Sequence, residues 1–234
     1  MKLYSEVVRR ESLADPQIRT MYGLMDTFYD HMEPDAFLKD LADKDYCILL
    51  LDGGGQIVGF STQKTTSVAV GGEEVFGVFS GDTIIHKDFW GSRELFTAFA
   101  SHYLAYGEKY EEYYWFLIVK GYKTYKILST FFLEFYPRAG APVPTREAAI
   151  MAAYGQAFFP GDYNARTGVV EYRRIKDVLK IGVADVDERV RRDQNARFFE
   201  RANPGYLHGN DLVCIAKLSK ENIRPAAHRL LFGR

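Results

Sequence analysis

The stretch from Thr83 to Leu95 constrains the fold of this chain more than any other. It begins as the apolar end of a buried strand, passes through a short polar segment and continues with the apolar spacing of a helix. Where a strand leads through a loop into a helix, several backbone N–H groups point at one spot. Such a junction can bind an anion, most commonly a phosphate group. We therefore predict a phosphate-binding loop here.

Apolar runs and turn residues predict the elements around this junction. The continuous apolar runs at 46–51 and 113–119 are typical of strands buried on both faces of a sheet. Gly71 and Gly72 join two long strands into a hairpin. We predict strands at residues 3–8, 46–51, 57–70, 75–85, 113–119, 169–172 and 212–216. We predict helices from Asp15 and Pro34 onward and at residues 91–110, 122–135, 147–158 and 185–201.

The order of these elements predicts the fold class. Three consecutive antiparallel strands followed by alternating helices and strands indicate an α/β protein with a mixed, mostly antiparallel central sheet flanked by helices. Residues 1–137 form the predicted core, because Pro137 ends a helix and a connection rich in Pro, Ala and Gly follows. Residues 138–234 form a C-terminal extension with a helical segment and a final strand that can rejoin the sheet.

Charge and composition exclude several classes of protein. The formal net charge of -1 gives no electrostatic support for nucleic-acid binding. No window is long and apolar enough to span a membrane, and the charged start has no signal-peptide run, so we expect a cytoplasmic protein. Cys47 and Cys214 lie far apart in apolar runs, which indicates two core thiols rather than a disulfide or a metal pair.

Several other chemistries lack their motifs. Gly53-Gly54-Gly55 is followed by a strand rather than a helix, and Val58 fills the third glycine position of a dinucleotide-binding loop, so a hairpin turn is favoured. The sequence has no H-E-x-x-H, no C-x-x-C and no acidic calcium loop, and we expect no metal. It has no G-x-S-x-G elbow, which disfavours a serine hydrolase.

Residues 46–137 resemble the GNAT family of N-acyltransferases. In that family a strand leads into a loop of the pattern Q/R-x-x-G-x-G/A, which holds the pyrophosphate of coenzyme A, and residues 86–91 (HKDFWG) match the lead-in and the first glycine. Arg93 replaces the second glycine and either obstructs the pyrophosphate or pairs with it through its guanidinium. The resemblance implies a GNAT-like fold and a donor site made by Ile85, His86, Lys87, Phe89, Trp90, Gly91, Ser92 and Arg93.

The resemblance also implies an activity. An acyl group would pass directly from a thioester, either acyl-CoA or an acyl carrier protein, to the amine of a small molecule. The donor is then a co-substrate, and no tightly bound cofactor is expected. A backbone amide near Ile85 is expected to hold the tetrahedral oxyanion. Three nearby lysines either contact a phosphate or a carrier protein or form a solvated face, namely Lys120, Lys123 and Lys126.

Such a transfer needs an acid and a base. Tyr122 or Tyr125, at the start of the helix that follows the 113–119 strand, is expected to protonate the departing thiolate. The amine must lose a proton, and Asp82 is the first candidate for the base. Glu74 is the second candidate.

Three questions stay open at the level of the sequence. A protein with this fold can bind an acyl ligand without turnover, and Arg93 favours that alternative. Residues 139–210 can instead serve as an interaction surface for a partner protein. The acyl length is also open, because five aromatic residues either line a tunnel for a long chain or fill one another's space, namely Phe76, Phe79, Tyr114, Phe116 and Phe132.

Overall fold

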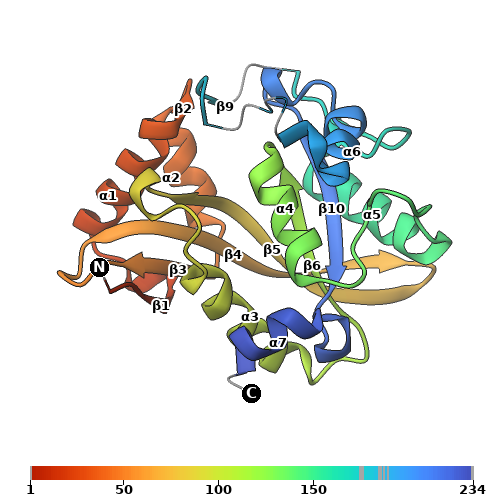
Figure 1. Ribbon diagram of the computed structural model, residues 1–234, viewed down its shortest axis with the longest axis horizontal. Coiled ribbons are helices and arrows are strands. Elements are labelled where there is room, and N and C mark those ends of the chain that lie inside the picture. The colour runs from red at the N-terminus through yellow and green to blue at the C-terminus, as the bar shows by residue number, and fades with distance from the viewer. Residues whose placement is uncertain (1, 174–176, 184–185, 187, 189, 233–234) are drawn as a thin grey trace.

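The computed structural model describes residues 2–173, 177–183, 186, 188 and 190–232. They build one large sheet with helices on both sides (Figure 1). A separate two-stranded ladder pairs β2 (Tyr29–Asp30) with β9 (Val178–Leu179). The strands of the large sheet lie in the order β1 (Tyr4–Arg9), β3 (Tyr46–Leu51), β4 (Ile57–Val70), β5 (Glu73–Ile85), β6 (Tyr113–Val119), β10 (Asp211–Lys217), β8 (Val169–Val170) and β7 (Tyr163–Asn164).

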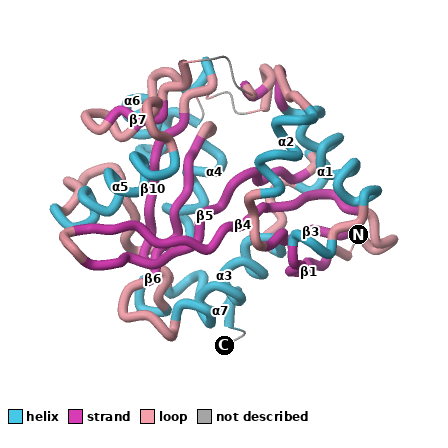
Figure 2. Tube along the Cα trace, turned by 180° about the vertical axis from the view of Figure 1, so that it is seen from behind, coloured by secondary structure: helices cyan, strands magenta, loops and turns pink. Residues whose placement is uncertain are grey.

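The helices divide between the two sides of the sheet (Figures 1 and 2). One side carries α3 (Glu94–Gly107), α4 (Tyr122–Phe131), α6 (Gln194–Ala202) and α7 (Pro225–Phe232). The other side carries α1 (Asp15–Phe28) and α2 (Pro34–Ala42) over one part of the sheet and α5 (Thr145–Phe158) over another.

Burial on both sides explains the continuous apolar runs. Along β3, Ile48 and Leu50 pack on the α3 side, while Cys47, Leu49 and Leu51 pack under α1 and α2. Successive side chains of a strand point to opposite faces, so a strand covered on both sides needs an apolar residue at every position. Each of these five residues is buried.

The predicted fold class is confirmed. Among the strands of the large sheet β5 and β6 are parallel, and the other neighbouring pairs are antiparallel. The prediction for the two cysteines is also confirmed, because Cys47 and Cys214 are free thiols buried in the core.

Several predicted helices are shorter in the structure. The helix predicted at 91–110 begins at Glu94, because Gly91 has a φ of +91° that a helix does not allow. The helix predicted at 122–135 ends at Phe131, after which the chain straightens and Tyr136 bridges to β10. Of the helix predicted at 185–201, the structure has 194–202; residues 185, 187 and 189 lie outside the described part.

The C-terminal part of the chain supplies a strand next to the centre of the sheet. β10 pairs with β6 on one edge and with β8 on the other. The division of the chain at residue 137 stays a prediction. In the part of the chain that the structure describes, no helix combines the length and the apolar character needed to cross a membrane.

Candidate active site at the opening between β5 and β6

The two parallel strands separate part-way along their length. They are paired from Phe76 to Ser80 of β5, and beyond Ser80 the strand β5 continues to Ile85 beside β4. Among the described residues, no strand pairs with the other edge of residues 81–85. An unpaired strand edge offers its N–H and C=O groups to whatever lies next to it. The opening is therefore lined on one side by a strand edge that pairs with no other described strand.

A β-bulge shapes this part of β5. Gly81 and Asp82 together lie opposite the single residue Thr62 of β4. A Cβ on Gly81 would lie 2.6 Å from Thr62 Oγ1 and 2.7 Å from Lys44 Cε, so a larger side chain has no room there. Ile84 packs in the core under α1 and α2, and strand alternation puts Asp82 on that same face. The bulge thus turns a carboxylate toward the side of α1 and α2.

The backbone of Ile85 faces the opening. The N–H of His86 donates to the carbonyl of Val58 in β4 over 2.8 Å. Because adjacent residues of an antiparallel strand direct their backbone groups to opposite edges, the N–H and C=O of Ile85 point away from β4. The carbonyl accepts a hydrogen bond from Trp90 Nε1 over 2.8 Å. The N–H lies on the edge from which the sequence predicts an oxyanion donor.

The loop between β5 and α3 is tightly folded. A single 3-10 turn covers Lys87–Phe89, and the imidazole of His86 accepts a backbone N–H from within this turn. Gly91 follows in a left-handed conformation that residues with a Cβ avoid. Arg93 is the N-cap of α3 and makes no side-chain cap. The loop therefore leads directly from β5 into the helix, as the sequence predicts.

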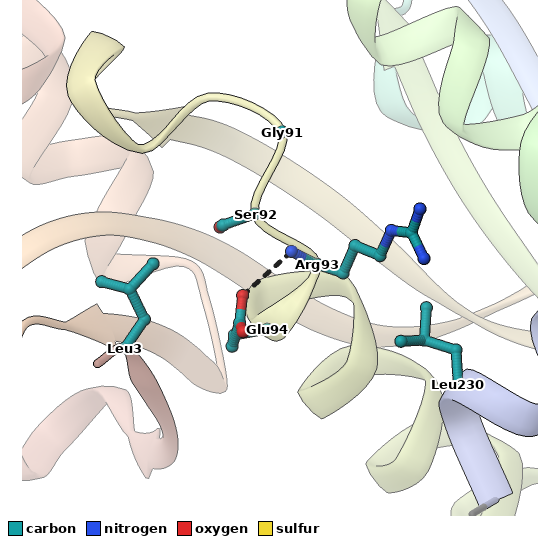
Figure 3. Close-up of a pocket in the computed structure, with 6 residues that line it drawn as sticks. All are labelled: Leu3, Gly91, Ser92, Arg93, Glu94 and Leu230. Atoms are coloured by element: carbon teal, nitrogen blue, oxygen red, sulfur yellow. Dashed lines mark hydrogen bonds between the residues drawn. The ribbon is translucent and has the colours of Figure 1, made fainter. Parts of the chain in front are cut away.

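A pocket of about 300 Å³ lies at the N-terminus of α3 (Figure 3). Gly91, Ser92 and Arg93 line it together with Glu94, and two leucines complete the wall. The Arg93 side chain extends away from Glu94 (Figure 3). Ser92 Oγ is buried and has no hydrogen-bond partner among the described residues. Three of the residues predicted to bind the donor therefore meet around one hollow.

Glu94 occupies the position that an anion would take. Its Oε2 accepts the backbone N–H of Arg93 over 2.9 Å, the dashed line in Figure 3. A carboxylate in the first turn of a helix is favoured by the helix dipole, as a phosphate would be. A phosphate that binds here must replace this carboxylate and remain close to its negative charge.

Removal of that charge is expected to strengthen donor binding. Glu94→Gln should lower the Kd for coenzyme A about two- to fivefold, which matches the ~0.3–1 kcal/mol that a charge at a helix terminus contributes. Calorimetry measures the Kd, and the gain should shrink as salt is added. Glu108→Gln, just beyond the far end of α3, is the control and should leave the Kd unchanged. An unchanged or weaker affinity in Glu94→Gln would contradict the prediction.

The hydroxyls of the two candidate acids, Tyr122 and Tyr125, both donate hydrogen bonds within the protein. Tyr122 donates to Asp193 Oδ2 over 2.7 Å, and Tyr125 donates to the carbonyl of Pro137 over 2.9 Å. Burial raises the pKa of both tyrosines, and the hydrogen bond to Asp193 raises the pKa of Tyr122 further. Each hydroxyl therefore keeps its proton at neutral pH, but must leave an internal acceptor before it can protonate a thiolate. The acid role of either tyrosine stays a prediction.

The two candidate bases lie at opposite ends of β5. Asp82 is at the opening, whereas Glu74 lies beside the hairpin turn, where Ser67 Oγ donates to it over 3.0 Å. Asp82 is eight positions further along the strand than Glu74, which corresponds to about 26 Å. Glu74 is therefore a predicted site residue that lies far from the opening.

Asp82 belongs to a group of polar residues on its side of the sheet. Burial raises the pKa of the Tyr29 hydroxyl, and the charges of Asp177, Asp82 and Asp211 raise that pKa further. These residues come from four separate parts of the chain. Tyr29 and Asp211 carry no motif that links them to residue 82, so the sequence does not predict their proximity.

A buried ion pair lies close to this group. Lys120 follows the last residue of β6, and its Nζ donates to the carbonyl of Gly209 over 2.7 Å and to Asp211 Oδ2 over 2.9 Å. The hydroxyl of Tyr172 donates to the same oxygen over 2.8 Å. Lys120 is therefore part of neither a solvated face nor a phosphate site. The sequence contains one hint of this pair. Lys120 directly follows the apolar run 113–119 and Asp211 directly precedes the apolar run 212–216, and these two runs become the neighbouring strands β6 and β10.

Among known proteins, the chain is similar to several solved structures in fold. No family model and no curated protein sequence matches the chain. A probable N-acyltransferase from Enterococcus faecalis V583 aligns at 15% identity and a TM-score of 0.42, over 56% of this chain and 33% of its own length. A GNAT family N-acetyltransferase from Escherichia coli, solved with CoA, aligns at 13% identity and a TM-score of 0.39, over 56% and 70%.

A third solved structure is similar to the same degree. An aminoglycoside acetyltransferase from an uncultured soil metagenomic sample, solved with sisomicin, aligns at 16% identity and a TM-score of 0.36, over 49% of this chain and 76% of its own. The chain spans about a third of the length of the Enterococcus protein. At these identities the likeness concerns the arrangement of elements and not the ligands.

Proposed function

We propose that the protein is a GNAT-like N-acyltransferase that moves an acyl group from a thioester to the amine of a small molecule. The observation that carries this proposal is that the opening between β5 and β6 is continuous with the loop of residues 86–93. An unpaired strand edge and a helix N-terminus thus lie along one path. Acyl-CoA has a matching part for each, an extended amide-bearing arm for the strand edge and a pyrophosphate for the helix.

In the proposed reaction the amine attacks the thioester carbonyl inside the opening. The N–H of Ile85 stabilises the oxyanion as the carbon becomes tetrahedral. Asp82 accepts the proton that the amine loses, directly or through a water molecule. The C–N bond forms, the C–S bond breaks, and the thiolate takes a proton from Tyr122 or Tyr125 once that hydroxyl leaves its internal acceptor. No covalent intermediate with the protein is formed.

We infer that the donor is acyl-CoA rather than an acyl carrier protein. A free coenzyme carries the pyrophosphate that the pocket at α3 suits. The lysines considered for a carrier protein are engaged, since Lys120 is buried and Lys126 lies 3.9 Å from Asp193. We assign the reaction to the cytoplasm, because the two unpaired thiols fit a reducing compartment.

A second candidate function is binding of an acyl ligand without turnover. The engaged hydroxyls of Tyr122 and Tyr125 favour it, because a binding protein needs no acid. Release of free thiol from acetyl-CoA in the presence of primary amines, together with calorimetry of coenzyme A, separates the two. Binding with thiol release supports the enzyme, and binding without release for every amine supports the second candidate. Absence of binding would contradict both.

The packing of the five aromatic side chains favours a short acyl group. On the α5 side, the rings of Phe116 and Tyr154 stack with their centroids 4.8 Å apart, and Phe79 lies 6.0 Å from Tyr154. On the opposite side, Phe76 stacks on Tyr110 at 4.5 Å.

Rings that fill one another's space on two different faces do not form one tunnel. The affinity for the donor is therefore expected to stay level from acetyl-CoA through butyryl-CoA to hexanoyl-CoA. A tunnel would instead add about 0.8 kcal/mol for each methylene that it buries. Competition calorimetry with this series is the measurement. A steady rise in affinity with chain length would show that the rings open into a tunnel.

A further inference from the structure

Trp90 lies across the proposed donor site. Its Nε1 donates to the carbonyl of Ile85 over 2.8 Å, on the edge of β5 that faces the opening. Lys123 Nζ, from the first turn of α4, lies 3.3 Å from the centroid of the indole. The ring of Phe28, the last residue of α1, lies with its centroid 6.0 Å from that of Trp90. One side chain therefore joins three elements that border the opening.

The indole of Trp90 is hydrogen-bonded to a backbone carbonyl that an extended ligand would need as its own partner. A ligand that lies along a free strand edge pairs with the N–H and C=O groups of that edge. The carbonyl of Ile85 is such a group, and the N–H of Trp90 already satisfies it. The ammonium of Lys123, in the first turn of α4, lies over the indole face. In this arrangement Trp90 replaces a ligand amide and holds a cation.

The contacts of Trp90 are reversible ones. Its side chain is 45% exposed, whereas Trp115, the other tryptophan, is 5% exposed in the core. Hydrogen bonds and cation–π contacts at exposed sites are individually weak. Gly91, with a φ of +91°, follows directly and gives the backbone beside Trp90 conformations that other residues avoid. The indole can therefore leave the edge of β5 by giving up these contacts and its packing against the ring of Phe28.

We propose that Trp90 is a gate on the donor site, which covers the free edge of β5 until coenzyme A displaces it. This inference rests on the proposed function, since it takes coenzyme A as the ligand. Displacement exposes the carbonyl of Ile85 to an amide N–H of the coenzyme arm and releases Lys123 from the ring toward a phosphate. A ligand opens the gate only when it brings an N–H that replaces that of the indole. The cost of displacing Trp90 therefore falls on the complete coenzyme, whose arm takes the place of the indole, and not on a nucleotide fragment that lacks the arm.

Two ligands and two substitutions at Trp90 test the gate. Trp90→Ala is expected to lower the Kd for coenzyme A about five- to tenfold, because no hydrogen bond and no cation–π contact must be broken first. Its Kd for adenosine 3′,5′-bisphosphate, which has no amide arm, should not change. Trp90→Phe keeps a ring beneath Lys123 and lacks the N–H, so its gain should be smaller. Leu133→Ala removes another exposed apolar side chain and is the control.

Tryptophan fluorescence reports on the same event in the wild-type protein. Acrylamide reaches Trp90 and not the buried Trp115. Coenzyme A should change the quenching and the bisphosphate should not. Equal or weaker coenzyme A affinity in Trp90→Ala, beside normal wild-type binding, would overturn the gate and leave the proposed function in place. Absence of coenzyme A binding in the wild type and in both variants would overturn both.

Discussion

Lys120→Met is expected to lower the free energy of unfolding by about 3–5 kcal/mol, the largest stability effect that the structure implies. Asp211 is 1% exposed, and its carboxylate is held by the ammonium of Lys120. Methionine has a similar length and no charge, so the carboxylate would stay buried with the neutral hydroxyl of Tyr172 as its remaining close partner. An uncompensated charge in the interior is far more costly than the loss of an ion pair as a whole.

That difference defines the control experiments for the ion pair. The double variant Lys120→Met/Asp211→Asn should recover much of the lost stability, because no buried charge then lacks its partner. Lys126→Met, an exposed lysine of α4, should cost less than about 1 kcal/mol. Urea unfolding at equilibrium measures all three variants. If Lys120→Met were no less stable than Lys126→Met, the ion pair would have no part in joining β6 to β10.

Asp82→Asn is expected to reduce kcat/KM for acyl transfer about 10²–10⁴-fold, the range that a general base contributes. The bulge at Gly81 brings this carboxylate to the opening, and asparagine has the same size without the basic oxygen. Because Asp82 is assigned to the amine and not to the predicted phosphate loop, the Kd for coenzyme A should stay the same. Thiol release measures the rate, and calorimetry measures the Kd.

Glu74→Gln is the matched control for this prediction. It is the same change in charge on the same strand, about 26 Å from Asp82 along β5. We expect its rate to equal that of the wild type. If the two variants lost activity equally, the effect would come from charge on the strand and not from a base. If Asp82→Asn kept full activity, the base would be another residue of the opening.

The sequence predicts the sheet well because its strands are buried on both faces. Residues 46–51 and 113–119 are apolar at every position, as a strand buried on both faces must be. Such a run therefore predicts its own structure without information from distant residues. The ends of helices are predicted less well. The short α4 ends at Phe131, and the next residue, Phe132, bridges to Ile223, about ninety residues further on. A local pattern contains no information on such a distant partner.

In the predicted donor loop, the motif predicts some features of the pocket and not others. The positions of Gly91, Ser92 and Arg93 around one pocket follow from their proximity in the chain. The position of the Glu94 carboxylate does not, because an acid in the first turn stabilises a helix whether or not an anion binds beside it. In the structure its carboxylate takes the very N–H group of Arg93 that a phosphate would use.

By itself the sequence determines the α/β class, the order of the elements and the strand-loop-helix junction, since each depends on residues that are near neighbours in the chain. The tertiary structure alone decides that β5 and β6 separate beyond Ser80, that a bulge places Asp82 beside this point on the face covered by α1 and α2, and that Glu74 stays far from it. It also decides that Lys120 meets Asp211. The physical reason is that these contacts arise from strand pairing and from the divergence of the sheet, which bring together side chains far apart in sequence and carry no local periodicity.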